Sequence, residues 1–189
     1  MDDSRILVFD LECTCWKGRP PAGMRQEIIE IGCSMFNKDT NQITQRRSFI
    51  VKPITSDVSA FCTKLTSITQ SMVDSEGISL KEACEQILSE YDSQNVISSS
   101  WGRTDTKYLK DDCRFAGIKY PLSKIHINLQ RRFMLHMGLK HEMSVTNALK
   151  HVGMEFDGKQ HRAVDDAYNT ALLLSHVMST TSTSVNGSK

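Results

Sequence analysis

The sequence predicts an α/β domain with a mixed five-stranded sheet, an antiparallel meander followed by parallel strands, and helices on both faces. Residues 1–51 contain three short segments rich in strand-forming residues, separated by loop and turn residues. After Pro53 helical segments alternate with two further short apolar runs. Such alternation is typical of one α/β domain in which helices cover both faces of the sheet.

The predicted strands are apolar runs bounded by turn residues or acids. The first ends in acids, as a buried central strand does when its tip opens into a site. A loop that contains Gly18 and Pro20 follows it, and the third strand is expected to pair antiparallel with the second. The five strands are predicted at residues 5–12, 27–36, 43–51, 96–100 and 126–129.

Capping residues mark several of the predicted helices. Thr66 is expected to cap a short helix through Val73, and Ser79 with Glu82 forms a capping box. The helices are predicted at residues 66–73, 79–91, 105–115, 144–152 and 162–178. Residues 179–189 show no apolar periodicity, so we expect a domain at 1–178 and a disordered tail at 179–189.

Length and composition exclude several classes of protein. A chain of 189 residues can bury a full core as one domain, and it has no apolar run long enough to cross a membrane. The N-terminal segment is acidic where a signal peptide would be basic. Six cysteines without regular spacing indicate reduced thiols in a cytoplasmic protein. Cys13 and Cys15 lack the spacing and the further ligands of a zinc site.

The formal net charge of +1 conceals an uneven distribution of charge. Residues 1–100 carry 10 basic and 14 acidic side chains, residues 101–162 carry 12 and 6, and residues 163–189 carry 1 and 2. The middle part also holds five of the six histidines. A basic surface of this kind is either a solvated face or a contact region for nucleic acid.

Two acids close the first predicted strand. Asp10 and Glu12 are two positions apart, so their side chains point to the same face of the sheet. A buried pair of carboxylates is unfavourable unless cations or water offset the charge. The pair indicates a functional site, unless the strand has simply ended and both acids are solvated.

A helical wheel of the last predicted helix separates its two adjacent acids. At about 100° per residue, Asp166 lies at the edge of the apolar face and Asp165 on the far side. Asp166 is thus expected to reach the sheet and Asp165 to face solvent; alternatively, either acid only complements the helix N-terminus. Small residues would let the helix approach closely. The apolar face consists of Ala163, Ala167, Ala171, Leu174 and Val177.

A third acidic site, Asp105, follows the fourth predicted strand. Alone it is a first-turn helix residue. Combined with the other acids and a histidine ahead of the last helix, it points to metal binding, and carboxylates without a thiolate suit Mg²⁺ or Mn²⁺. The complete set is Asp10, Glu12, Asp105, His161 and Asp166.

The order and spacing of this set resemble those of the DEDDh 3′→5′ exonucleases, which have the RNase H-like fold. The resemblance covers about residues 4–178 and is strongest to the enhanced-RNAi (ERI-like) exoribonucleases. Two segments without catalytic acids support it, at residues 61–70 (FCTKLTSITQ) and 153–158 (GMEFDG).

The resemblance implies a two-metal mechanism. Two Mg²⁺ or Mn²⁺ ions would surround the scissile phosphate, held by Asp10, Glu12, Asp105 and Asp166. Asp10 would bridge both ions, and Asp105 would act through water. His161 would be the general base that deprotonates the attacking water. Each cycle would release a nucleoside 5′-monophosphate.

The resemblance also implies contacts to the terminal nucleotide. Phe61 would stack on its base, unless this side chain belongs to the core. The backbone near Leu11 and Cys13 would hold the nucleotide, with Glu12 and His161 beside it.

One departure from the family concerns an aromatic residue. Relatives commonly carry Trp immediately before the third acid, where this chain has Thr104. Trp101, three residues earlier, is the candidate replacement.

Three functional hypotheses follow. The leading one is a metal-dependent 3′→5′ exoribonuclease that acts on single-stranded RNA or 3′ overhangs. A DNA-directed exonuclease of the proofreading or repair type, with the same fold, is the first alternative. The second is a non-catalytic RNA-binding module that keeps the basic surface.

Overall fold

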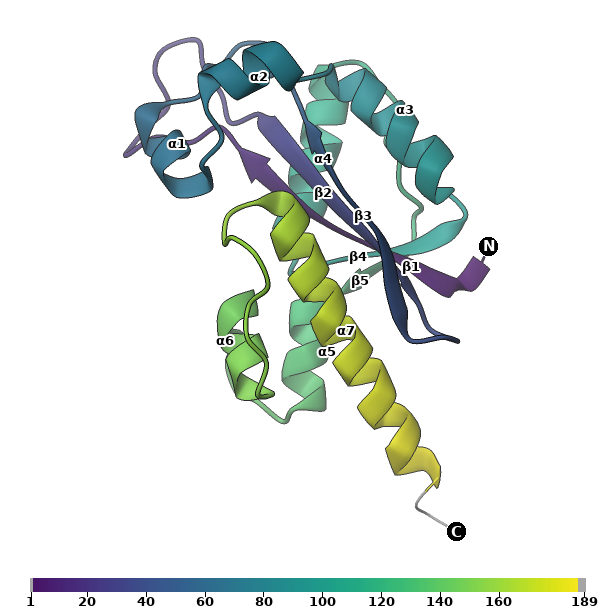
Figure 1. The fold of residues 1–189 in the computed structure, drawn as a ribbon. Coiled ribbons are helices and arrows are strands. Elements are labelled where there is room, and N and C mark those ends of the chain that lie inside the picture. The colour runs from purple at the N-terminus through teal and green to yellow at the C-terminus, as the bar shows by residue number, and fades with distance from the viewer. Residues whose placement is uncertain (1, 187–189) are drawn as a thin grey trace.

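The sheet is mixed, as predicted from the sequence. The structure is a computed structural model that describes residues 2–186, with side chains through residue 180. Its strand order is β3-β2-β1-β4-β5 (Figure 1). The pairs β1–β2 and β2–β3 are antiparallel, and β1–β4 and β4–β5 are parallel. The strands are β1 (Asp2–Cys13), β2 (Ile28–Asn37), β3 (Gln42–Ile50), β4 (Val96–Ser100) and β5 (His126–Asn128).

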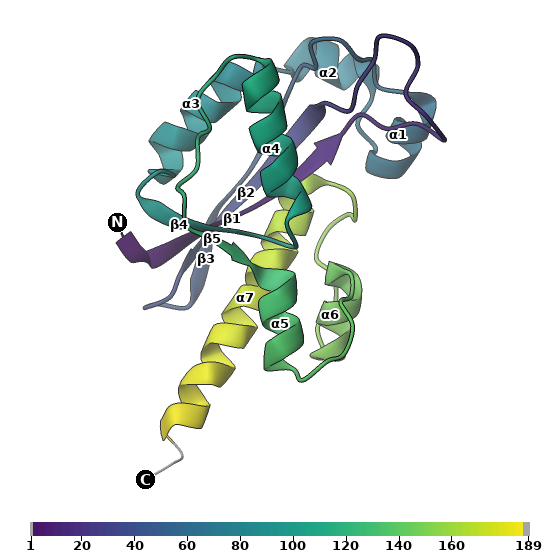
Figure 2. The same ribbon diagram turned by 180° about the vertical axis from the view of Figure 1, so that it is seen from behind.

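Helices cover both faces of this sheet, which confirms the predicted class (Figures 1 and 2). Helices α3 and α4 pack on one face, and α5, α6 and α7 pack on the other. Helices α1 and α2 lie near the end of β1. The helices are α1 (Ala60–Thr66), α2 (Gln70–Glu76), α3 (Leu80–Tyr91), α4 (Thr104–Phe115), α5 (Leu129–His136), α6 (Val145–His151) and α7 (Ala163–Asn186). Within the described residues, none of them combines the length and the hydropathy that crossing a bilayer would require.

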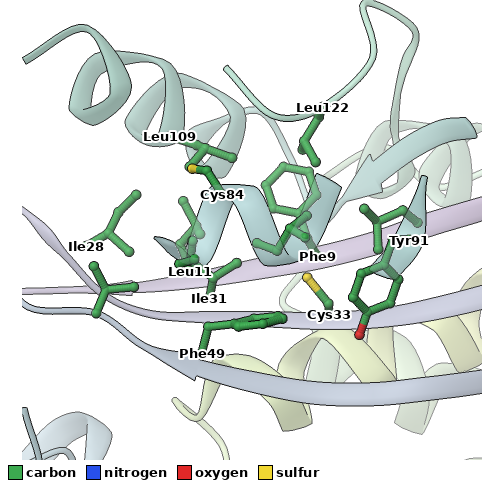
Figure 3. Packing of buried hydrophobic residues seen from close by; sticks show 14 of the residues in the cluster. Phe9, Leu11, Ile28, Ile31, Cys33, Phe49, Cys84, Tyr91, Leu109 and Leu122 are labelled. Carbon is green, nitrogen blue, oxygen red and sulfur yellow. The ribbon is translucent and has the colours of Figure 1, made fainter. Parts of the chain in front are cut away.

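Alternation along β1 divides the core into two layers. Leu7, Phe9 and Leu11 pack with α3 and α4, whereas Ile6 and Val8 pack with the helices of the other face. Figure 3 shows the first layer, in which residues of β1 and β2 meet Tyr91, Leu109 and Leu122. Even-numbered positions of β1 therefore face α7.

Helices α1, α2 and α5 differ from the prediction. Thr66 does not cap a helix but is the last residue of α1, and the cap of α2 is Thr69, whose side chain accepts a hydrogen bond from the Met72 amide. Helix α5 was not predicted. It begins at Leu129, which had been assigned to the fifth strand, and Asn128 caps it.

Helix α7 continues past Met178, where the sequence predicted its end. Residues 187–189, the last of the expected tail, lie outside the described residues. All six cysteines are free. Four of them are buried: Cys33, Cys62, Cys84 and Cys113.

Candidate active site

The first two predicted acids lie on the face of the sheet that α7 covers. Asp10 and Glu12 follow Ile6 and Val8 in the alternation of β1, so they continue the same side of the strand beyond the core. Both are partly buried. Their positions agree with the same-face prediction.

The first turn of α7 brings a third carboxylate to this pair. Carboxylate oxygens of Asp10, Glu12 and Asp166 lie within 4.8 Å of one another. The apolar face predicted for the helix is confirmed, because Ala163, Ala167 and the residues that continue it are buried. Asp166 thus reaches the sheet, as its place on the helical wheel predicted.

A glycine makes this close approach possible. Gly32 of β2 lies opposite Asp10 in the antiparallel register. A Cβ atom on Gly32 would lie 2.0 Å from the carbonyl carbon and oxygen of Ala163. Real Cβ atoms do not approach backbone so closely, so α7 can begin here only over a glycine.

Asp105 occupies the first turn of α4 and is buried. It lies outside the group of three oxygens that meet within 4.8 Å, but its charge still contributes to the raised pKa of Asp10. The fourth acid therefore lies near Asp10 but outside this group of three.

Burial, with neighbouring charges, disfavours the ionisation of the four carboxylates. Burial, together with the neighbouring acids, raises the pKa of Glu12 to about 8 and that of Asp10 well above its ordinary value. Burial is also the main cause that raises the pKa of Asp105 to about 6 and that of Asp166 to about 7. Such a cluster of oxygen donors fits a divalent cation, which would offset the repulsion.

His161 belongs to the turn that leads into α7. Its backbone has a left-handed conformation, with φ of 61°, and its amide donates a 2.8 Å hydrogen bond to Oδ2 of Asp166. The residue is exposed. The histidine is therefore tied through its backbone to one of the clustered acids.

Asp165 does not face solvent as predicted. Its carboxylate accepts hydrogen bonds from Arg46 of β3 and from the Lys159 amide, at 2.5 and 2.8 Å. Arg46 also pairs with Asp157. A Cβ on Gly158 would meet the Asp165 carboxylate. The acid therefore holds the turn at 157–161 against α7 and β3.

Glu30 is a site-supporting residue that sequence reasoning missed. It is fully buried on β2, opposite Glu12, and accepts hydrogen bonds from Nε and Nη2 of Arg162 and from the Ala163 amide, at 3.0–3.1 Å. These bonds fasten the start of α7 to β2. A charged residue inside the apolar run 27–36 was the available signal.

The predicted stacking residue lies on the surface beside the site. Phe61 of α1 is 42% exposed, so its side chain is not part of the core. Helix α1 is held to the end of β1 by Ser59, whose hydroxyl donates to the Cys15 carbonyl at 2.6 Å, and by a contact of the Cys62 thiol with the Cys13 carbonyl.

Trp101 is committed to packing elsewhere. Its Nε1 donates to the Met143 carbonyl at 2.9 Å, and its ring lies 5.8 Å from that of Phe133. Thr104, by contrast, is exposed. Trp101 therefore does not replace the aromatic residue missing at position 104.

Known proteins with this fold and sequence pattern are exonucleases. The RNase T family, described as "Exonuclease", matches residues 7–174. Human 3'-5' exoribonuclease 1 is 30% identical over 177 residues, which covers 88% of this chain and 50% of the relative. The chain thus spans half the length of that relative.

Two further comparisons cover more of the related protein. The 3'-5' exonuclease Snipper of Drosophila melanogaster is 31% identical over 193 residues, covering 90% of this chain and 68% of the relative. The solved nuclease domain of 3'hExo, a DEDDh family member bound to rAMP, has a TM-score of 0.84 and 26% identity, covering 94% of this chain and 93% of that chain. The chain therefore belongs to the RNase T family of exonucleases, in its DEDDh group of 3′→5′ exonucleases.

Proposed function

We propose that this chain is a metal-dependent 3′→5′ exoribonuclease that releases nucleoside 5′-monophosphates. The observation that carries the proposal is the meeting of Asp10, Glu12 and Asp166 within 4.8 Å, with Asp105 adjoining. RNA as the substrate is supported by a relative named exoribonuclease and by the rAMP bound to a similar nuclease domain.

The residues present fit a pair of Mg²⁺ or Mn²⁺ ions. Asp10, Glu12 and Asp166 would hold them directly, and Asp105 would act from its more distant position through water. Bound divalent cations would lower the pKa of the attacking water, and their charge would stabilise the leaving 3′ oxygen. Burial is the main cause of the raised pKa values of Glu12 and Asp166, and neighbouring acids add to it; a bound cation would favour the charged form of both groups.

His161 would take the proton of the attacking water at an imidazole nitrogen. Its exposure leaves the ring accessible to water and substrate. The bond from its amide to Asp166 couples its position to the carboxylates, while Asp165 and Arg46 hold the preceding turn.

The substrate would be single-stranded RNA or a 3′ overhang. Phe61 would stack on the terminal base, which grips the base without selecting its identity. Backbone near Leu11 and Cys13 would contact the same nucleotide. Because α1 is held to the end of β1, the position of Phe61 relative to the carboxylates is fixed.

A digestion series tests the proposal. The purified protein should shorten 5′-labelled single-stranded RNA in Mg²⁺ or Mn²⁺ one nucleotide at a time, and chelator or Asp10→Ala should stop it. The control is Asp39→Ala, which removes an exposed acid of the β2–β3 turn. Full trimming by Asp10→Ala would contradict the proposal. Preference for DNA of the same sequence would refute the assignment of RNA, and RNA binding without product in either metal would indicate a binding module.

A further inference from the structure

The outer face of α4 carries a row of cations that the proposed chemistry does not use. Arg103, just before the helix, and Lys107, Lys110 and Arg114 recur every three or four residues, so they share one face. All four are exposed. They line a groove of about 410 Å³, to which His126 of β5 also contributes. These four residues and this groove are called the α4 basic groove below.

The opposite face of α4 is turned to the interior. Asp105, Leu109 and Cys113 are buried there, together with Asp112. Burial of this stripe sets the rotation of the helix about its axis. The row of cations is therefore held toward solvent, while the first turn of the same helix supplies Asp105 to the carboxylate cluster.

The charge of the α4 basic groove is only partly neutralised. Asp111 pairs with both Lys107 and Arg114, each at 2.9 Å. These two side chains nevertheless stay 69% and 77% exposed. Within the described residues no carboxylate lies in ion-pair distance of Arg103 or Lys110. Four cations against one acid leave a positive surface.

One end of the groove lies at the first turn of α4, which carries Asp105. Arg103 is two residues before Asp105, and it also lines a second polar groove with Asn128 and Arg131 at the start of α5. Arg103 and Lys110 both lie close enough to His126 to act on its pKa, which burial lowers. The cations thus extend from the N-terminal end of α4, where Asp105 lies, toward its C-terminal end. Figure 2 shows the course of this helix.

We infer that the α4 basic groove binds the phosphate backbone of the RNA strand on the 5′ side of the scissile bond. This inference rests on the proposed exoribonuclease function. Each phosphate carries a negative charge, and lysine and arginine attract it without selecting a base sequence. At a rise of 1.5 Å per residue the row is about 16 Å long, enough for more than one phosphate.

Binding measurements on a matched pair of triple variants test the inference. The groove variant is Lys107→Ala/Lys110→Ala/Arg114→Ala, which removes three positive charges from the groove. Alanine at exposed helix positions preserves the helix. Lys38→Ala/Lys81→Ala/Lys150→Ala removes three charges from other surfaces. Both triples are made in the Asp10→Ala background, in which no turnover is expected. The probes are a 12-nucleotide 5′-fluorescein oligouridylate and the dinucleotide UpU, whose single phosphate is the scissile one, so that no upstream phosphate is left for the groove.

The groove variant should bind the 12-mer about tenfold more weakly at 0.1 M salt. The slope of its log binding constant against log salt concentration should be shallower by about 2, since each lost phosphate contact to single-stranded nucleic acid reduces this slope by roughly 0.7. Its affinity for UpU should equal that of the background. Unchanged 12-mer binding, or an equal loss in the control triple, would overturn the inference. A native chain that binds the 12-mer but does not trim it in Mg²⁺ would refute the proposed function and leave the groove assignment standing.

Discussion

Gly32 of β2 and Ala163 of α7 are in direct backbone contact, with no room for even a Cβ atom between them. Gly32 is also the register partner of Asp10. The β1–β2 pair, which carries Asp10 and Glu12, therefore packs directly against the start of the helix that carries Asp166. Assembly of the carboxylate cluster depends on this contact.

Gly32→Ala is accordingly expected to destabilise the protein and abolish activity. The added methyl must displace the start of α7, at a cost of about 3 kcal/mol, and it moves Asp166 away from Asp10. Urea unfolding and RNA trimming measure the two effects. Gly117→Ala is the control, because nothing lies within 4 Å of its Cβ position and only its positive φ opposes the change. It should cost about 1 kcal/mol and keep activity. Native stability and trimming in Gly32→Ala would show that the contact is dispensable.

Burial of the carboxylates, together with repulsion by neighbouring acids, predicts a pH-dependent stability of the metal-free protein. In the fold the pKa of Glu12 is about 8 and that of Asp166 about 7, whereas unfolded carboxyls titrate near 4. The folded state thus binds protons more tightly, and the free energy of unfolding should fall as pH rises from about 4 to about 8. Mg²⁺ should restore the free energy of unfolding that is lost as pH rises, most strongly at pH 8.

Asp10→Asn should remove much of this penalty. In chelator at pH 8 its Tm should exceed that of the native chain by at least about 3 °C, since 1 kcal/mol moves the Tm of a domain this size by roughly 2–4 °C. Mg²⁺ should stabilise it less. Asp39→Asn, an exposed change, should leave the melting curves in place. Equal melting of Asp10→Asn and native protein at pH 8 would refute mutual repulsion as the cause.

The places of three candidate acids were predictable because they depend on local spacing. Alternation on a strand placed Asp10 and Glu12 on one face, and the helical period placed Asp166 beside its buried alanines. The supporting contacts were not predictable in this way. Glu30 meets Arg162, and Gly32 meets Ala163, across more than 130 positions of sequence. No pattern within one element specifies such partners.

Asp165 illustrates the same limit. The helical wheel correctly put it away from the apolar face, but Arg46 from β3 reaches that side of the helix. The errors in the helices are more local. Thr66 and Thr69 are both suitable caps by residue type, and Thr66 instead bonds back to the Cys62 carbonyl at 3.0 Å. Helix α5 buries only Leu129 and Phe133, too few residues for a clear helical period.

The neighbouring acids of α7 should respond to substitution in opposite ways. Asp165→Ala leaves the Lys159 amide without its acceptor and leaves Arg46 paired with Asp157 alone, so it should cost about 2 kcal/mol of stability while retaining part of the trimming rate. Asp166→Ala removes one of the repelling carboxylates, so metal-free stability at pH 8 should be kept while trimming is lost. Unfolding curves and single-turnover rates on both variants check this. Equal rates in the two variants, or a stable Asp165→Ala protein, would contradict the assignment.

Phe61→Ala should weaken substrate binding with little effect on folding. The ring is 42% exposed and stacking on a base contributes roughly 1–3 kcal/mol. Stacking acts on the ground state and the transition state alike, so KM should rise about tenfold or more with kcat nearly constant. Leu88→Ala on α3 is matched in exposure, at 39%, and should leave KM unchanged. A lower Tm with an unchanged KM in Phe61→Ala would mean that the ring stabilises α1 rather than the nucleotide, and the grip on the terminal base would then have to come from backbone at the end of β1.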